Sequence, residues 1–198
     1  MKTLSQRSDL VVIGSGLAGI CAAVSASREG ATVSLIESRS CVGGRIGKEI
    51  QFPYDFEGTT NYAYQRETGI LDEIKTTIYQ ENQEGNYCGQ ERALMSWIKK
   101  QERVELFLET QLFEVKKNSA GDKIESIIAI SSQRGGRIIF RAPYFIDCSG
   151  DGTLSQLANA PGETGLDKRE YEKSTASSTP VTFRAAASMQ ITVSAKPI

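Results

Sequence analysis

Residues 9–19 read DLVVIGSGLAG, an apolar run followed directly by three glycines. The run Asp9–Ile13 is typical of a strand buried on both faces in a parallel sheet. From Leu17 to Glu29 apolar residues recur at helical spacing, and Gly30 supplies a stop signal. We therefore expect a strand, a glycine turn and a helix, in that order.

A second apolar run, Ala31–Glu37, ends in an acid that lies 18 residues beyond Gly19. Strand, turn, helix and strand within about 30 residues form a βαβ unit with a right-handed crossover. A carboxylate at this position accepts hydrogen bonds from a ribose diol and repels a 2′-phosphate. The pattern predicts an adenine dinucleotide without that phosphate, and a plain glycine-rich turn with an exposed glutamate is the alternative.

Each glycine of the GxGxxG motif has a distinct expected role. Gly14 permits the tight turn, and Gly19 lets the helix pack closely on the strand. A side chain at Gly16 would collide with an approaching pyrophosphate, whose charge suits the positive end of the helix dipole.

A second glycine pair distinguishes FAD from NAD. The segment Glu37–Arg45 reads ESRSCVGGR, so the backbone comes close to a long dinucleotide again just after the ribose-binding acid. The order GxGxxG, then Glu, then GGR resembles the two-dinucleotide-binding-domain flavoproteins. Within them the chain is most similar to FAD-dependent oxidoreductases with a glutathione-reductase-type FAD domain.

The resemblance covers about residues 8–160. Strands are expected at 104–109 and, as an antiparallel meander, at 111–117, 124–132 and 136–141. A further buried strand, Tyr144–Cys148, runs into Ser149-Gly150-Asp151-Gly152, which resembles the family's D-(A/C)-(T/S)-G-D-G motif near the flavin. A short helix follows at 153–159. We expect an α/β fold: a three-layer Rossmann-like FAD/NAD(P)-binding domain with a parallel sheet and an antiparallel β-meander.

The resemblance also implies a set of cofactor-binding residues. Backbone atoms at Leu112 and Phe113 would hold the adenine, although plain strand core is an equal alternative for their side chains. Arg39 either stacks on adenine or is solvated, and Arg45 either pairs with phosphate or lies on the surface. Cys41 is either flavin-linked or an inert thiol. The expected set is Gly14, Ser15, Gly16, Leu17, Ala18, Gly19, Glu37, Ser38, Arg39, Gly43, Gly44, Arg45, Leu112, Phe113, Ser149, Gly150 and Asp151.

Composition excludes several function classes. The chain of 198 residues has no His, which excludes a Ser-His-Asp triad, a Cys-His dyad and a His-ligated metal, and we expect no metal site. A net charge of −1 gives no field for nucleic acid. No apolar run is long enough to span a membrane, and the N-terminus is a poor signal peptide. The four separated cysteines suggest unpaired thiols in a reducing, cytoplasmic setting.

The expected domains are residues 1–160, the first segment of an FAD-binding domain, and 161–198, a linker and the beginning of an incomplete substrate domain. The late glycine-aspartate motif of such flavoproteins is not found, so we expect a truncated member, a fragment, or a module completed by a partner chain or homo-oligomer. The expected function is flavin-mediated hydride or electron transfer on an unidentified small molecule. The alternatives are an NAD-dependent dehydrogenase and a truncated, non-catalytic nucleotide-binding fragment.

Overall fold

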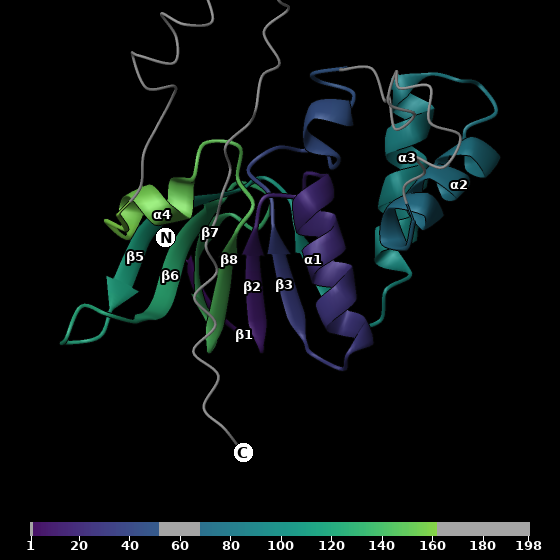
Figure 1. Cartoon of the computed structure of the whole chain (residues 1–198). Coiled ribbons are helices and arrows are strands. Elements are labelled where there is room, and N and C mark those ends of the chain that lie inside the picture. Colours follow the sequence, from purple (N-terminus) through teal and green to yellow (C-terminus); the bar gives the residue numbers. More distant parts are fainter. Residues whose placement is uncertain (1, 52–67, 162–198) are drawn as a thin grey trace, which may run out of the picture. The chain divides into compact units, whose positions relative to one another are not determined.

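A parallel sheet is built around β2 (Leu10–Ile13), the strand expected to be buried on both faces. In the computed structural model, which describes residues 2–51 and 68–161, β2 lies between β3 (Val33–Ile36) and β8 (Tyr144–Asp147). Beyond β3 lies β4 (Val104–Phe107), which gives the order β4-β3-β2-β8. Figure 1 shows β3, β2 and β8 side by side. Every residue of β2 is buried, which confirms the prediction for this strand, and β3 forms where a second strand was expected and is likewise fully buried.

Helices cover one face of this sheet. They are α1 (Leu17–Arg28), α2 (Ile70–Glu81) and α3 (Tyr87–Lys99). Val12 on β2 belongs to the same buried apolar cluster as Ile20 of α1 and Leu94 of α3. The apolar residues at helical spacing on these segments therefore face the sheet, as amphipathic helices do.

A second sheet covers the opposite face. The antiparallel strands β5 (Thr110–Lys117), β6 (Ile124–Ser131) and β7 (Gly136–Arg141) form the expected meander. Val11 and Ile13, the alternate residues of β2, pack in a cluster with Phe107 and Phe140, whose rings meet edge to face at 4.9 Å. Helices, parallel sheet and second sheet make three layers, so the predicted α/β class and layer number are confirmed.

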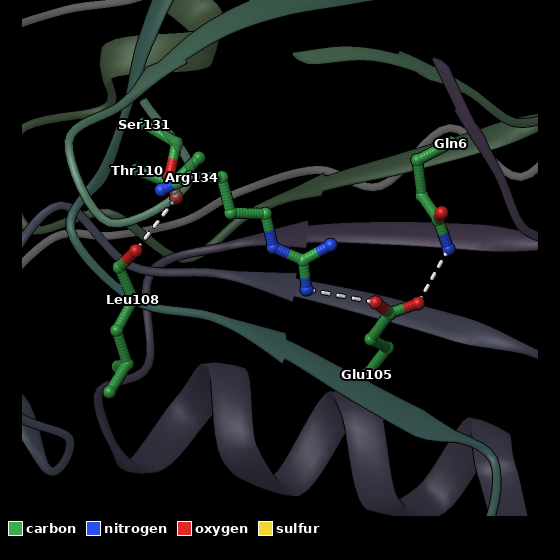
Figure 2. A network of polar contacts seen from close by, with 6 residues as sticks. All are labelled: Gln6, Glu105, Leu108, Thr110, Ser131 and Arg134. Carbon is green, nitrogen blue, oxygen red and sulfur yellow. Dashed lines mark hydrogen bonds and ion pairs between the residues drawn. The ribbon is translucent and has the colours of Figure 1, made fainter. Parts of the chain in front are cut away.

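Polar contacts join the exposed edges of the two sheets (Figure 2). The carboxylate of Glu105 on β4 accepts a hydrogen bond from Gln6 Nε2 at 2.7 Å and pairs with Arg134 Nη2 at 3.0 Å. The Arg134 guanidinium also lies 4.3 Å from the centroid of the Phe107 ring. Nearby, the Thr110 hydroxyl donates to the Leu108 carbonyl at 2.8 Å. Because the Glu105–Arg134 pair is half-exposed, it orients the edges more than it stabilises the fold.

Two features differ from the sequence prediction. The N-terminal strand β1 (Lys2–Arg7) was not expected; it pairs in parallel with β7, giving the second sheet the order β1-β7-β6-β5. The prediction that Tyr144–Cys148 is a buried strand is wrong: Tyr144 is 58% exposed and residues 145–147 are only half-buried. The reason is that β8, among the described residues, pairs only with β2.

The described chain ends with α4 (Thr153–Leu157), shorter than the expected helix at 153–159. Almost all of the predicted linker and substrate-domain segment, 161–198, lies outside the described residues. Of the helices in 2–51 and 68–161, none is both long and apolar enough for a membrane span.

Candidate cofactor site

The three glycines of the first turn occupy different surroundings. Gly14 has φ +99°, and a Cβ there would overlap the carbonyl oxygen of Cys148. A Cβ on Gly19 would overlap the carbonyl oxygen of Gly14. A Cβ on Gly16, in contrast, would meet no atom within 4 Å. Gly14 and Gly19 are therefore required by the fold itself, whereas Gly16 borders open space.

The N-terminus of α1 adjoins this open space. Its N-cap is Gly16, in extended conformation and with no side-chain cap, and its first turn contains no acidic residue. The first N–H groups of a helix have no partner within the helix and carry the positive end of its dipole. The position thus combines backbone donors with room for an anion.

Glu37 lies at the carboxyl end of β3, beside the glycine turn. Its Oε2 accepts hydrogen bonds from the Ser15 backbone N–H at 2.9 Å and from the Ser15 hydroxyl at 2.7 Å. Its Oε1 accepts from the Arg39 N–H at 3.0 Å and from the Ser38 hydroxyl at 3.3 Å. Glu37 is only 8% exposed, so these contacts hold its carboxylate in one orientation.

The second glycine pair packs on the first turn. The Gly43 N–H donates to the Ser15 carbonyl at 2.9 Å, and a Cβ on Gly44 would lie 3.0 Å from the Gly16 Cα. Gly44 also has φ +55°, which favours glycine. A short 3₁₀ turn, Gly44–Ile46, then begins and leaves Arg45 exposed. Sequence reasoning placed this pair near the dinucleotide, but its direct backbone contact with the GxG segment is a structural finding.

The loop after β8 reaches the same edge of the sheet. The Cys148 N–H donates to the Ile13 carbonyl at 2.8 Å, immediately before the glycine turn. Beyond it, Gly150 and Asp151 are exposed, and a Cβ on Gly150 would meet no atom within 4 Å. The structure therefore brings Ser149–Asp151 beside the first turn, at the carboxyl ends of parallel strands, where ligands of such sheets bind.

Asp147, which the sequence analysis did not select, organises this loop. Its Oδ1 accepts from the N–H and hydroxyl of Ser149, and its Oδ2 accepts from the N–H and hydroxyl of Ser155. The signal available was its place as the first acid of the D-C-S-G segment, but the sequence could not show which donors it meets.

The start of β5 also adjoins Glu37. The Thr110 N–H donates to the Glu37 carbonyl at 2.8 Å. Leu112 is buried in the core between the sheets, whereas Phe113 is 53% exposed at a bulge in the pairing of β5 with β6. The strand-core interpretation therefore holds for the Leu112 side chain and is wrong for that of Phe113. Successive side chains of a strand point to opposite faces, and Leu112 points into the core.

Arg39 and Cys41 meet the same acid in the segment between β3 and the second glycine pair. Arg39 Nε lies 3.5 Å from Glu49 Oε2, with both side chains about two-fifths exposed. Burial, then a hydrogen bond with Glu49, raises the pKa of the Cys41 thiol to about 11. This protonated, buried thiol has the properties of an inert cysteine. All four cysteines are free, as predicted.

The comparison with known families decides the assignment. The profile of the family described as FAD dependent oxidoreductase matches residues 9–194, nearly the whole chain. The chain belongs to the FAD-dependent oxidoreductases. FAD is the cofactor of this family, as the sequence predicts.

Solved structures of similar fold agree with the FAD-dependent oxidoreductase assignment at the level of architecture. A geranylgeranyl bacteriochlorophyll reductase-like protein from Thermoplasma acidophilum is 16% identical with a TM-score of 0.56, over 82% of this chain and 44% of that one. The p-nitrophenol 4-monooxygenase of Pseudomonas putida DLL-E4 is 14% identical with a TM-score of 0.50, over 84% and 46%. A weaker match, on which the likeness of fold does not rest, is L-proline dehydrogenase from P. horikoshii, 18% identical with a TM-score of 0.45 over 76% and 24%.

This FAD-dependent oxidoreductase chain therefore spans less than half the length of these three proteins. No curated protein sequence matches it. The described residues fit the family's cofactor, because Gly16 and Gly150 leave space that any Cβ would fill and Glu37 presents an ordered carboxylate beside them.

Proposed function

We propose that this chain provides the FAD-binding segment of an oxidoreductase that transfers hydride or electrons between the flavin and a small-molecule substrate. One observation carries the proposal. The glycine turn, Glu37, the Gly43–Gly44 pair and the loop Ser149–Asp151 converge at the carboxyl ends of β2, β3 and β8. This is the edge where dinucleotides bind to open parallel sheets.

The first βα unit would hold the pyrophosphate and the adenine-side ribose. The N–H groups at the start of α1, next to the open space at Gly16, would bind the pyrophosphate. The Glu37 carboxylate would accept from the ribose diol through Oε1. That oxygen is the more available of the two, because its contact with the exposed Ser38 hydroxyl is the longest that Glu37 makes, at 3.3 Å.

The remaining predicted residues would complete the site. Backbone atoms at Leu112 and Phe113 would contact the adenine, since β5 begins beside Glu37. The loop Ser149–Asp151 and Arg45, exposed on the 3₁₀ turn, would approach the dinucleotide from the other strand ends.

Bound FAD supplies the redox chemistry, and the chain's own residues bind and orient it. The role of residues 161–198 as a linker and the beginning of a substrate domain stays a prediction of the sequence.

The test is uptake of FAD by the purified chain. The chain is stripped of any bound flavin, incubated with FAD, NAD or neither, and desalted, and its visible absorption is recorded. We expect a flavin band only after FAD, together with quenched flavin fluorescence, and no NAD in the ultraviolet spectrum of the supernatant after the NAD-treated protein is denatured. A colourless protein after FAD, or retention of NAD in place of FAD, contradicts the proposal.

A further inference from the structure

Asp147 lies where the cofactor loop leaves the parallel sheet. It is the last residue of β8 and is in register with Ile13, the last residue of β2. The next residue, Cys148, hydrogen-bonds to the Ile13 carbonyl and contacts the glycine turn so closely that Gly14 has no room for a Cβ. The conformation of the chain just after Asp147 therefore decides how the second loop meets the first.

The carboxylate of Asp147 accepts hydrogen bonds from both ends of this loop. At the near end, Ser149 donates to Oδ1 from its N–H at 3.1 Å and from its hydroxyl at 2.6 Å. At the far end, Ser155 on α4 donates to Oδ2 from its N–H at 2.9 Å and from its hydroxyl at 3.0 Å. The Ser149 hydroxyl in turn accepts from the Thr153 N–H at 2.8 Å. One side chain thus ties together the first and last parts of residues 149–155.

The residues between these two ends are the ones that face outward. Gly150 and Asp151 are exposed, and the space beside the Gly150 Cα is empty. Gly152 has φ +65°, so the loop turns back sharply into α4. The hydrogen bonds of Asp147 therefore hold an open backbone segment beside the glycine turn.

From this arrangement we propose that Asp147 is a positioning residue for FAD: it shapes the loop 148–152 for the cofactor and does not touch the cofactor itself. The inference rests on the proposed function and deepens it. Both carboxylate oxygens are already engaged by two donors each, so Asp147 acts through Ser149 and Ser155.

A carboxylate, and not an amide, is needed at this position. The N–H groups of Ser149 and Ser155 are fixed donors on opposite oxygens of Asp147. An asparagine has one oxygen and one NH₂, so one of these N–H groups would face another donor. Hydroxyls rotate to adapt, but backbone N–H groups do not.

The experiment compares Asp147→Asn, Ser155→Ala and Ser155→Thr with the wild-type chain. FAD affinity is measured by fluorescence titration, thermal unfolding is followed without FAD, and the absorption band of the bound flavin is recorded. We expect Asp147→Asn to weaken FAD binding about tenfold, as loss of a hydrogen bond to a charged group does. Ser155→Ala should weaken it less, and Ser155→Thr, which keeps the hydroxyl, should bind like wild type.

Asp122→Asn is the matched control, because Asp122 also accepts a side-chain hydrogen bond, from Asn118 at 2.7 Å, in the exposed β5–β6 turn. It should leave FAD affinity unchanged. If Asp147→Asn lowers only the unfolding temperature while the folded protein binds FAD with wild-type affinity and spectrum, Asp147 merely stabilises the fold and the inference is wrong. A wild-type chain that takes up no FAD overturns the proposed function as well, so the two failures are distinguishable.

Discussion

Ser15 donates two hydrogen bonds to a single oxygen of Glu37, one from its backbone N–H at 2.9 Å and one from its hydroxyl at 2.7 Å. Ser15 is fully buried and Glu37 nearly so. The pair joins the first glycine turn to the end of β3. A charged acceptor so placed must keep its donors, because a buried carboxylate without them is strongly destabilising.

Ser15→Ala should lower the free energy of unfolding by about 1.5–3 kcal/mol, the range for a hydrogen bond to a charged group. The measurement is urea denaturation of the FAD-free protein. Ser132→Ala is the matched control, since its hydroxyl also donates to a glutamate, Glu109 at 3.1 Å, but in an exposed position. An equal, small loss of unfolding free energy in both variants would show that burial does not strengthen the contribution of the Ser15–Glu37 pair to stability.

Glu37→Gln should weaken FAD binding about tenfold or more, because the amide cannot accept from both the Ser15 and Arg39 N–H groups and still accept from ribose. Glu37→Arg should weaken it further by removing every acceptor. Fluorescence titration with FAD measures both, and Glu109→Gln serves as the control. Unchanged affinity in these variants would mean that this acid does not contact the ribose.

Gly16→Val should abolish detectable FAD binding while leaving the unfolding temperature of the FAD-free protein within about 2 °C of wild type. The Cβ enters open space, and Gly16 has φ −67°, so neither the Cβ nor the backbone conformation opposes the substitution in the protein itself. Ala120→Val, in the exposed β5–β6 turn, is the control for adding an exposed valine. Retained FAD uptake by Gly16→Val would place the cofactor elsewhere.

Gly19→Ala should have the opposite signature, a loss of stability of about 1–3 kcal/mol or more without FAD, since its Cβ would overlap the Gly14 carbonyl oxygen and force the backbone apart. Chemical denaturation checks this, with Gly150→Ala as the comparison because a Cβ there meets nothing. A Gly19→Ala variant as stable as Gly150→Ala would rule out the close packing of α1 on the turn.

Cys41 should react slowly with iodoacetamide at pH 8, where a pKa of about 11 leaves on the order of one thiol in a thousand ionised. Its rate should rise steeply towards pH 11, whereas the exposed Cys88 should be modified first. Peptide mass spectrometry separates the two. Fast modification of Cys41 in the folded protein at pH 8 would contradict this description of the thiol.

The same raised pKa has a consequence for stability. The unfolded chain ionises Cys41 near its ordinary pKa of 9.0 and the folded chain only near 11. Between these values the unfolded state binds fewer protons, so the stabilising contribution is complete below about pH 9 and is lost as the pH rises to 11. Cys41→Ala should show a shallower alkaline loss of stability than wild type in denaturation measured across this range.

Local patterns predicted the first βα unit well. The signals were the DLVVI run, the GxGxxG spacing and the apolar residues up to Val24, and each depends on residues close together in the chain. The expected strand, turn and helix are all present in the structure. The strand β1 was not predicted because Leu4 is its single apolar residue, so it has no alternating pattern, and its partner β7 lies more than 130 residues away. The sequence also did not predict that β8 is an edge strand. The segment YFID resembles a buried strand in composition, and its edge position follows only from the strand pairing.

The sequence by itself determined the first βα unit and which glycines form its turn, because steric rules for glycine and strand–helix periodicity operate within a few residues. The family and its cofactor followed from the resemblance of the ordered motifs GxGxxG, Glu37 and Gly43-Gly44-Arg45 to FAD-dependent oxidoreductases. Only the tertiary structure decided that Gly44 rests against Gly16, that Ser15 holds Glu37, and that Asp147 ties Ser149 to Ser155. These contacts join residues whose side chains have several possible partners. The packing of β3 and β8 on either side of β2 selects one partner for each.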